Sequence, residues 1–450
     1  MPERAFTEPL YTAAEMRAAE ERYAGFPESA PELMERAGAA VAREALAAFP
    51  DAQSFAVVCG GGANGGDGRI AARDLRDAGR DAVETHAVEG ADVIVDALFG
   101  TGFAGEPRAE AASLIERMNA AGAPIVSVDL PSGVDASTGE IAGAAVRASL
   151  TVTFHGPKVG LAVAPGLFHA GEVVVAEIGL AEAETAHRLV RSDILELVPR
   201  KGAADTKYTA GAVLVVGGAP GLTGAVCLAA EAAFRADAGY VAVAVPPASL
   251  PVVEAKLLEP VKRTWAEIDE VVERAGAVAI GPGLGRTDEA HELVARLLRE
   301  LEQPVVLDAD ALHELEPGDW RPRVVLTPHA GELGRLLGKE SSWVDAHRLE
   351  AVRLASERFG CTCLLKGADT IVAEPGAAVL VCTADAPALA TAGTGDVLTG
   401  VLAAYLAKGM EPLVAAAAAA IATAEAAQQV PFRAGVIASD ILAALPSIRR

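Results

Sequence analysis

Several features are scarce in this 450-residue chain, and each scarcity excludes a class of protein. Phe, Trp and Tyr make up 4% of the residues, so the cores must be built from Ala, Val and Leu. The 38 Lys and Arg are outnumbered by 61 Asp and Glu, which gives a formal net charge of −23. Such a surface repels nucleic acid, so we expect no nucleic-acid partner and attribute the charge to solubility. The 51% hydrophobic content excludes a disordered chain.

Metal-binding cysteine patterns, targeting signals and membrane segments are also scarce. The five cysteines show no zinc-type spacing, which predicts reduced core thiols and a cytoplasmic location. The N-terminal residues include early acidic side chains and form no apolar signal core. The Ala-rich run 414–427 contains Glu425, and alanine is a weak membrane former. We therefore predict a packed helix there and no association with a membrane.

What the chain does contain is a repeated order of buried strands, glycine-bearing turns and helices. A helical segment at 33–49 precedes three continuous apolar strands that begin near residues 54, 91 and 123. Apolar strands separated by helices predict a parallel sheet covered on both faces. Charged, irregular sequence lies between roughly 179 and 209, and a second, longer series of strands and helices follows. We therefore predict two α/β domains, at 1–185 and 190–450.

The first candidate site lies at the carboxyl ends of the predicted strands, where parallel sheets bind ligands. GGGANGGDG at 60–68 is predicted to be a loop whose N–H groups bind an anionic or carbonyl ligand, with a helix starting near Arg69. The glycines equally fit a purely structural turn. Asp96 and Asp129 end the next two strands, and such carboxylates could hold a cation or act as acid and base. Lys158 is either a solvated surface charge or the partner of a phosphate or Asp129.

The second candidate site centres on TAGTGD at 391–396. Gly393 and Gly395 keep the backbone open, so that consecutive N–H groups form an anion site at the start of a helix. Asp396 would be repelled by a phosphate there unless it has a task, such as taking a proton from a hydroxyl that attacks a phosphoryl group. The alternative is a simple helix cap. KGADT at 366–370 follows a strand near the nucleotide phosphates, and His329 is either a ligand contact or a cap.

In order and in type, these motifs resemble those of the bifunctional NAD(P)H-hydrate repair enzymes, over nearly the whole chain. YTAAEMRAAE, LMERAG, GGANGGDG, DALFGTGFAG, SVDLPSGVDASTG and GPKVGL resemble the epimerase domain, which is a Rossmann-like three-layer α/β unit. VLVVGGAPGLTGA, GPGLG, VLDADAL, TPHAGE, LLKGADT, ATAGTGDVLTG and GVIASDIL resemble the dehydratase domain, which has a ribokinase-like α/β fold.

The resemblance implies an activity for each domain. The first would interconvert the R and S hydrates of NADH and NADPH with the help of a potassium ion. The second would use ADP with magnesium to phosphorylate the hydroxyl of the S hydrate, giving AMP, and loss of phosphate would restore the nicotinamide ring. The partners would be these small molecules, and the family suggests a homo-oligomer.

The resemblance also assigns residues to roles. In the epimerase domain it implies catalysis by Asp129 and Lys158 and binding of the hydrate by Asn64, Gly65, Gly66, Asp67, Gly100, Thr101, Gly102, Phe103, Ala104, Gly105 and Asp129. The potassium ligands would be Asn64, Asp96 and Ser132. In the dehydratase domain Asp396 would be the base, and the hydrate would contact Ala225, Gly283, His329 and Asp396. The nucleotide would lie near Lys366, Gly367, Ala368, Asp369, Thr370 and Gly395.

Three residues depart from the family pattern, and one alternative function remains open. Ala63 replaces an Asn whose side chain would bind the hydrate, Glu20 stands where Asp is common, and Ala386 stands where Asn is frequent. The alternative is a ribokinase-like small-molecule kinase with a non-catalytic N-terminal binding module, since GTGD alone fits ribokinase-like enzymes. A stable phosphorylated product would favour that alternative.

Overall fold

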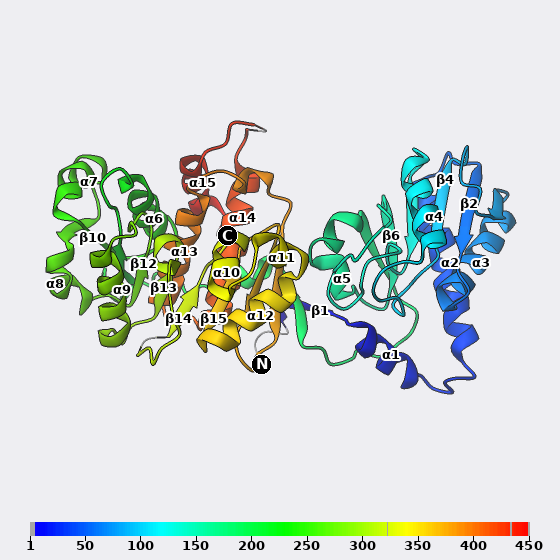
Figure 1. The fold of residues 1–450 in the computed structure, drawn as a ribbon, viewed down its shortest axis with the longest axis horizontal. Helices are drawn as coiled ribbons and strands as arrows, with labels where there is room; N and C mark the ends of the chain where they lie inside the picture. Colours follow the sequence, from blue (N-terminus) through cyan, green and yellow to red (C-terminus); the bar gives the residue numbers. More distant parts are fainter. Residues whose placement is uncertain (1–4, 322, 433, 449–450) are drawn as a thin grey trace. The chain divides into compact units, whose positions relative to one another are not determined.

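The computed structural model describes residues 5–321, 323–432 and 434–448 and divides into two compact α/β units (Figure 1). The first comprises Pro9–Arg188 with Asp345–His347, and the second comprises Leu189–Val344 and Arg348 onward, with the described residues before Pro9. The division at 188–189 lies within the segment where the irregular sequence predicts a boundary. Among the described residues, no helix is long and apolar enough to span a membrane.

The first unit is built on a sheet of six parallel strands. They are β2 (Ser54–Cys59), β3 (Asp81–Glu84), β4 (Val93–Ala97), β5 (Ile125–Val128), β6 (Leu150–Phe154) and β7 (Glu172–Ala176). Their order across the sheet is β3-β2-β4-β5-β6-β7. The helices are α1 (Ala13–Glu21), α2 (Ala30–Ala48), α3 (Ala63–Asp77), α4 (Ala109–Ala120) and the short α5 (Val159–Ala162).

Both faces of this sheet are buried, as the apolar strands predict. Along β2, Phe55 and Val57 pack into one core with α2 and α3, whereas Ala56 and Val58 pack into another with α4. This alternation follows from the two-residue period of a strand. The three-layer arrangement predicted for the N-terminal domain is therefore confirmed.

The prediction of a loop at 60–68 is wrong, because α3 already begins at Ala63. The glycines here allow close packing inside a helix. A Cβ atom on Gly65 would lie 1.9 Å from the carbonyl oxygen of Gly60, and one on Gly68 would lie 2.4 Å from the Cβ of Ala97. The sequence pattern did not distinguish a glycine-rich loop from a glycine-rich helix start, since glycine is unfavourable in helices unless packing requires it.

The second unit has an eleven-stranded mixed sheet in the order β1-β8-β17-β16-β15-β14-β13-β12-β9-β10-β11. The strands are β1 (Thr7–Leu10), β8 (His187–Val190), β9 (Ala212–Val216), β10 (Tyr240–Val245), β11 (Val261–Thr264), β12 (Ala277–Ile280), β13 (Val305–Leu307), β14 (Val324–Leu326), β15 (Thr362–Leu365), β16 (Asp369–Ala373) and β17 (Val379–Thr383). From β15 through β14, β13, β12, β9 and β10 to β11 all pairings are parallel, so these strands end at one edge.

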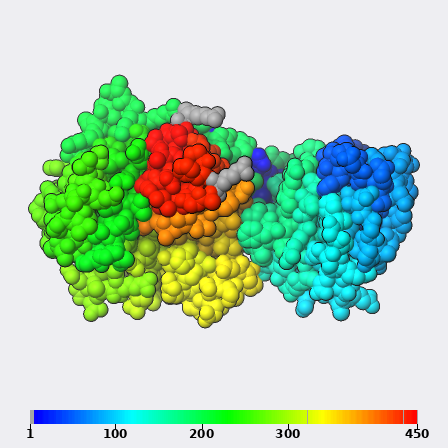
Figure 2. Space-filling model, turned by 90° about the horizontal axis from the view of Figure 1, so that it is seen from above, coloured from blue at the N-terminus to red at the C-terminus, as the bar shows by residue number. Residues whose placement is uncertain are grey.

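Helices cover this sheet as the sequence predicts. They are α6 (Thr223–Arg235), α7 (Leu250–Lys256), α8 (Asp269–Val272), α9 (Asp288–Glu300), α10 (Ala330–Leu337), α11 (Ser341–Ala346), α12 (Arg348–Phe359), α13 (Thr394–Ala407), α14 (Pro412–Gln429) and α15 (Ala438–Ala444). The Ala-rich run lies in α14, whose alanines pack into the main core, so the prediction of a packed helix is confirmed. The five cysteines are free and buried. The last part of the chain, including α15, is visible on the surface in Figure 2.

Candidate active sites

The first site lies at the carboxyl end of the six-stranded sheet, where Asp96 is the fourth residue of β4. The carboxylate is fully buried and accepts hydrogen bonds from the Ser132 hydroxyl at 2.6 Å and the Ser127 hydroxyl at 2.9 Å. The backbone N–H of Ser132 donates a further bond at 2.9 Å. Burial raises the pKa of Asp96, although these donors oppose the shift. Among the described residues, the groups that act on the Asp96 carboxylate are these donors and the N–H of Leu98, and none of them carries a positive charge.

Asn64 lies against the turn that follows β4 and has an unused donor. The backbone N–H of Phe99 donates to the Ser132 hydroxyl at 2.8 Å, and a Cβ on the next residue, Gly100, would lie 2.9 Å from Oδ1 of Asn64. Asn64 is buried, and its Nδ2 has no hydrogen-bond partner in the described part of the chain. Ser132 thus joins Asp96 to the Phe99–Gly100 segment, and Oδ1 of Asn64 lies against the same segment. The side-chain oxygens of these three residues are of the kind that hard cations prefer.

Asp129 and Lys158 form a buried ion pair. The Lys158 ammonium is fully buried and donates to Asp129 Oδ1 at 2.5 Å, to the Thr153 hydroxyl at 2.9 Å and to the carbonyl of Phe154 at 2.9 Å. Lys158 is therefore the partner of Asp129 rather than a solvated surface charge. Asp129 has a φ of 66°, which is uncommon for a residue with a side chain. Such a conformation persists only where the surrounding structure fixes it, and residues of this kind are frequent in active sites.

Two more carboxyl groups face this ion pair. Burial, together with the charges of Asp129 and Glu20, raises the pKa of Asp67 from 3.8 to about 8, against the opposing effect of Lys158. Burial and the charge of Asp129 also raise the pKa of Glu20. At neutral pH the site thus holds a protonated carboxyl group, Asp67, close to the Asp129–Lys158 pair. A protonated carboxyl group beside a buried ion pair is a candidate general acid.

The remaining predicted residues of this site form its rim. Gly65 and Gly66 belong to the first turns of α3, and the turn from Gly100 to Gly105 follows β4. Within this turn Phe103 stacks on Phe99 with ring centroids 4.6 Å apart, while Gly102, Ala104 and Gly105 are exposed. The turn therefore lies at the open edge of the site, where a ligand can reach it.

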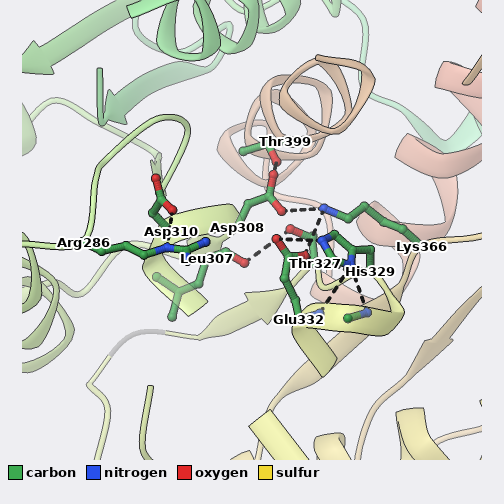
Figure 3. A network of polar contacts seen from close by, with 10 residues as sticks. Arg286, Leu307, Asp308, Asp310, Thr327, His329, Glu332, Lys366 and Thr399 are labelled. Atoms are coloured by element: carbon green, nitrogen blue, oxygen red, sulfur yellow. Dashed lines mark hydrogen bonds and ion pairs between the residues drawn. The ribbon is translucent and has the colours of Figure 1, made fainter. Parts of the chain in front are cut away.

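The second site is centred on Asp308, at the carboxyl end of β13 (Figure 3). Its carboxylate is 1% exposed and accepts hydrogen bonds from Nζ of Lys366 at 2.7 Å and from the Thr399 hydroxyl at 2.7 Å. These partners come from the end of β15 and from the second turn of α13, so Asp308 joins the sheet edge to the start of α13. Burial lowers the pKa of Lys366, but the charges of Asp308 and Glu332 outweigh this effect and raise it.

Asp396 lies in the first turn of α13 beside this group. The helix begins after Gly393, whose φ is 92°, so the first N–H groups of α13 face outward without intrahelical acceptors. A Cβ on Gly395 would lie 3.5 Å from Nζ of Lys366. Burial and the charge of Asp308 raise the pKa of Asp396 from 3.8 to about 7, while Lys366 opposes the shift. The structure gives Asp396 no side-chain cap hydrogen bond, so the simple helix-cap interpretation does not describe it.

Backbone contacts bring the other predicted loops to the same edge. The N–H of Ala219 donates to the carbonyl of Gly283 at 2.7 Å, which joins the turn before α6 to the turn after β12, and Ala225 lies in the first turn of α6. Gly283 needs its φ of 59°, and a Cβ there would lie 2.4 Å from the carbonyl of Leu222. A Cβ on Gly281 would lie 1.8 Å from the carbonyl of Asp308. The loops after β9, β12 and β13 therefore meet beside Asp308.

His329 and the 366–370 segment have roles that the sequence left open. Nδ1 of His329 accepts from the N–H of Gly331 at 3.0 Å, so the residue caps α10, while the ring is 55% exposed. Asp369 is buried, and its carboxylate pairs with Arg348 at 2.8 Å. Lys366 is the positively charged residue of this segment, and its Nζ reaches Asp308 at the centre of the site. Gly367, Ala368 and Thr370 lie on the accessible side of that segment.

Sequence reasoning assigned no site role to Asp308, Thr399 or Glu20. Asp308 ends an apolar strand, which is the same signal that identified Asp96 and Asp129, and VLDADAL was noted only as a motif. Thr399 and Glu20 carry no such signal, since each lies inside a helix, and only the tertiary structure brings them to the sites.

Comparisons with known proteins agree with this division. A family model described as NAD(P)H-hydrate dehydratase matches residues 213–447, and one described as YjeF-related protein N-terminus matches 30–91 and 80–160. The bifunctional NAD(P)H-hydrate repair enzyme Nnr of Pyrobaculum aerophilum is 40% identical, covering 93% of this chain and 93% of its own length. The enzyme of the same name from Moorella thermoacetica is 37% identical, with 93% and 92% covered.

Among solved structures, the ADP/ATP-dependent NAD(P)H-hydrate dehydratase of Bacillus subtilis, co-crystallised with ATP and Mg²⁺, is similar to the second unit. Its TM-score is 0.53 at 27% identity, over 57% of this chain and 94% of that chain. A ribokinase-like superfamily protein from Enterococcus faecalis has a TM-score of 0.53 at 25% identity, over 60% and 97%. The ribokinase-like fold predicted for the second domain is thus confirmed.

Proposed function

Because the chain belongs to the bifunctional NAD(P)H-hydrate repair enzymes, with an epimerase in its N-terminal half and a nucleotide-dependent dehydratase in its C-terminal half, we propose which residues carry each activity. Family membership also decides against the alternative of a small-molecule kinase with a non-catalytic N-terminal module. The observation that carries the assignment of the dehydratase site is Asp396, a carboxyl group with a pKa of about 7 at an anion-binding helix start.

In the dehydratase site, Asp396 accepts the proton of the hydroxyl of the S hydrate as that oxygen attacks the terminal phosphoryl group of the nucleotide. A base with a pKa near neutrality suits this step. Lys366 and the first N–H groups of α13 hold the phosphates, with Gly395 leaving room between them. Gly367, Ala368 and Thr370 line the nucleotide side, and Ala225, Gly283 and His329 contact the hydrate. Loss of phosphate from the ring, with loss of a proton from the adjacent carbon, then restores the double bond.

The proposed nucleotide is ADP, and Mg²⁺ would supply positive charge for its phosphates. The B. subtilis relative is described as ADP/ATP-dependent and was crystallised with ATP and Mg²⁺, so ATP is the competing co-substrate. Asp308 and Asp310 would be the residues to hold an Mg²⁺ ion, which prefers carboxylates together with phosphate oxygens.

In the epimerase site, Asp67 and Asp129 act as acid and base on the hydroxyl of the hydrate, and Lys158 holds Asp129 in its strained position. The protonated Asp67 donates to the hydroxyl so that the carbon–oxygen bond breaks and water leaves, and the ring nitrogen stabilises the resulting cation. Asp129 then accepts a proton from water as it adds to the opposite face, which inverts the configuration. The first turns of α3 and the turn from Gly100 to Gly105, with Thr101 and Phe103, bind the rest of the hydrate. Asn64, Asp96 and Ser132 hold a potassium ion, which would neutralise Asp96 and fix that turn.

The two activities are tested with separated R and S hydrates of NADH, incubated with ADP, Mg²⁺ and either potassium or sodium, while NADH absorbance is followed. Full conversion of both epimers is expected from the native protein with potassium. An Asp396→Asn variant should recover no NADH but still interconvert the epimers by chromatography. If an Asp129→Asn variant interconverts the epimers at the native rate, the assignment of Asp129 is refuted. If ATP supports the reaction and ADP does not, the proposed nucleotide is wrong.

A further inference from the structure

A second group of potential ligands lies in the dehydratase unit, away from the residues assigned to either reaction. His291 stands in the first turn of α9, and His313 and Glu314 follow the short 3-10 helix η6 (Ala309–Leu312). One ligand atom from each of the three residues lies within 4.8 Å of the others. The imidazole rings are 5.6 Å apart, and Nε2 of His313 lies 3.9 Å from Oε1 of Glu314.

The backbone at Glu314 and the position of the His291 ring are unusual for a cluster whose histidines are half-buried and whose Glu314 is exposed. Glu314 has a φ of 54°, a left-handed conformation that is uncommon for a residue with a side chain and that places its carboxylate beside the two rings. Nε2 of His291 is buried and has no hydrogen-bond partner among the described residues. A buried imidazole nitrogen without a partner loses its interaction with water unless something else occupies that position.

The three residues line a cavity of about 610 Å³, together with Leu298, Arg299 and Trp320. None of the residues assigned above to the hydrate, the nucleotide or the potassium ion lines it. The cavity leaves one side of the cluster open, so an ion bound by the three side chains would keep a coordination position for water or a small anion.

We propose that His291, His313 and Glu314 bind a divalent late first-row transition metal, with Zn²⁺ as the ion that fits best. Two imidazoles and one carboxylate with an open position form a recurrent ligand set for zinc. Imidazole ligands also select against Mg²⁺ and K⁺, which prefer oxygen. A bound ion would tie α9 to the segment that follows η6. The helix η6 itself contains Asp310, which pairs with Arg286 beside the dehydratase site.

The test uses the untagged full chain, freed of metal with a chelator, and titrates it with ZnCl₂ in excess Mg²⁺ and K⁺ so that sites for hard cations are filled. We expect ~1 tightly held zinc ion per chain by mass spectrometry after gel filtration, and a higher unfolding temperature with zinc than without. In His291→Ala and Glu314→Gln variants, zinc should bind at least about tenfold more weakly. Cobalt should give the visible bands of a low-coordinate site in the native chain, and these should be lost in Glu314→Gln.

The matched control is His86→Ala, which removes an exposed histidine of the other unit and should leave zinc binding unchanged. Because Glu314→Gln preserves the size of the side chain, it decides the outcome if His291→Ala does not fold. The proposal is overturned if the native chain retains no zinc after gel filtration. It is equally overturned if Glu314→Gln retains zinc with native affinity and the native cobalt spectrum.

Discussion

Replacing Asp396 by Asn should abolish the dehydratase reaction while leaving the fold intact. The substitution keeps the shape of the side chain but removes the proton acceptor, and general-base catalysis contributes about 10²–10⁴-fold to a rate. That loss corresponds to about 3–5 kcal/mol of transition-state stabilisation. The buried Asp308 remains paired with Lys366 and Thr399 in the variant, so the nucleotide-binding groups stay in place. Nucleotide affinity, measured by calorimetry, should therefore change far less than kcat.

The pH profile of the native chain provides an independent measure of the same group. Since the pKa of Asp396 is raised from 3.8 to about 7, the base is mostly protonated at pH 6 and mostly ionised at pH 8. The ionised fraction rises from about one tenth to about nine tenths, so kcat/KM should increase roughly tenfold over that interval. The assay is NADH formation from purified S hydrate at saturating nucleotide. A flat profile from pH 6 to pH 8 would refute the assignment of Asp396 as the base with this pKa.

Three further predictions concern the epimerase unit. Asp67→Asn should abolish epimerisation, and it should stabilise the fold more and more as the pH rises. The reason is that the pKa of Asp67 is raised from 3.8 to about 8 on folding, so the free energy of unfolding of the native chain falls by on the order of 1 kcal/mol per pH unit between these values. Lys158→Met should destabilise the unit by about 3–5 kcal/mol in denaturant titrations, because it leaves Asp129 buried without its partner. Gly65→Ala should lower the unfolding temperature, because its Cβ would meet a backbone oxygen at 1.9 Å, whereas Gly61→Ala, with nothing within 4 Å, should not.

Each of these has a result that would contradict it. A stability difference between Asp67→Asn and the native chain that is constant from pH 5 to pH 8 would show that the pKa of Asp67 is not raised. If the double variant Lys158→Met with Asp129→Asn is no more stable than Lys158→Met alone, the cost does not come from the unpaired carboxylate. Equal unfolding temperatures for the Gly65→Ala and Gly61→Ala variants would mean that α3 can move away from the sheet.

Much of the fold and the location of both sites follow from the sequence for a simple reason. Apolar strands with helices between them form parallel sheets, and parallel strands present their following residues at one edge. Asp96 and Asp129 were predicted on this basis and lie where it places them. The same reasoning applied to Asp308 would have located the centre of the second site.

What the sequence could not provide was the pairing of charges. Lys158 remained either a solvated charge or a partner of Asp129, because burial of a lysine depends on residues distant in sequence. Asp369 belongs to the KGADT motif expected near the nucleotide, and only the tertiary structure shows that its carboxylate pairs with Arg348 from α12. The start of α3 was misplaced because the favourable contacts of its glycines are made with β4 and α2, which local propensity does not include.

The glycines of α3 also limit how this enzyme can vary. Glycine has no smaller replacement, and every single-base change of a glycine codon that alters the residue adds a side chain. At Gly65 and Gly68 such a side chain would collide with the backbone or with β4. Few single substitutions on the buried face of the helix that carries Asn64 and Asp67 are therefore expected to leave the fold unchanged. Variation is left to exposed positions such as Ala63, which is where this chain departs from the pattern of its relatives.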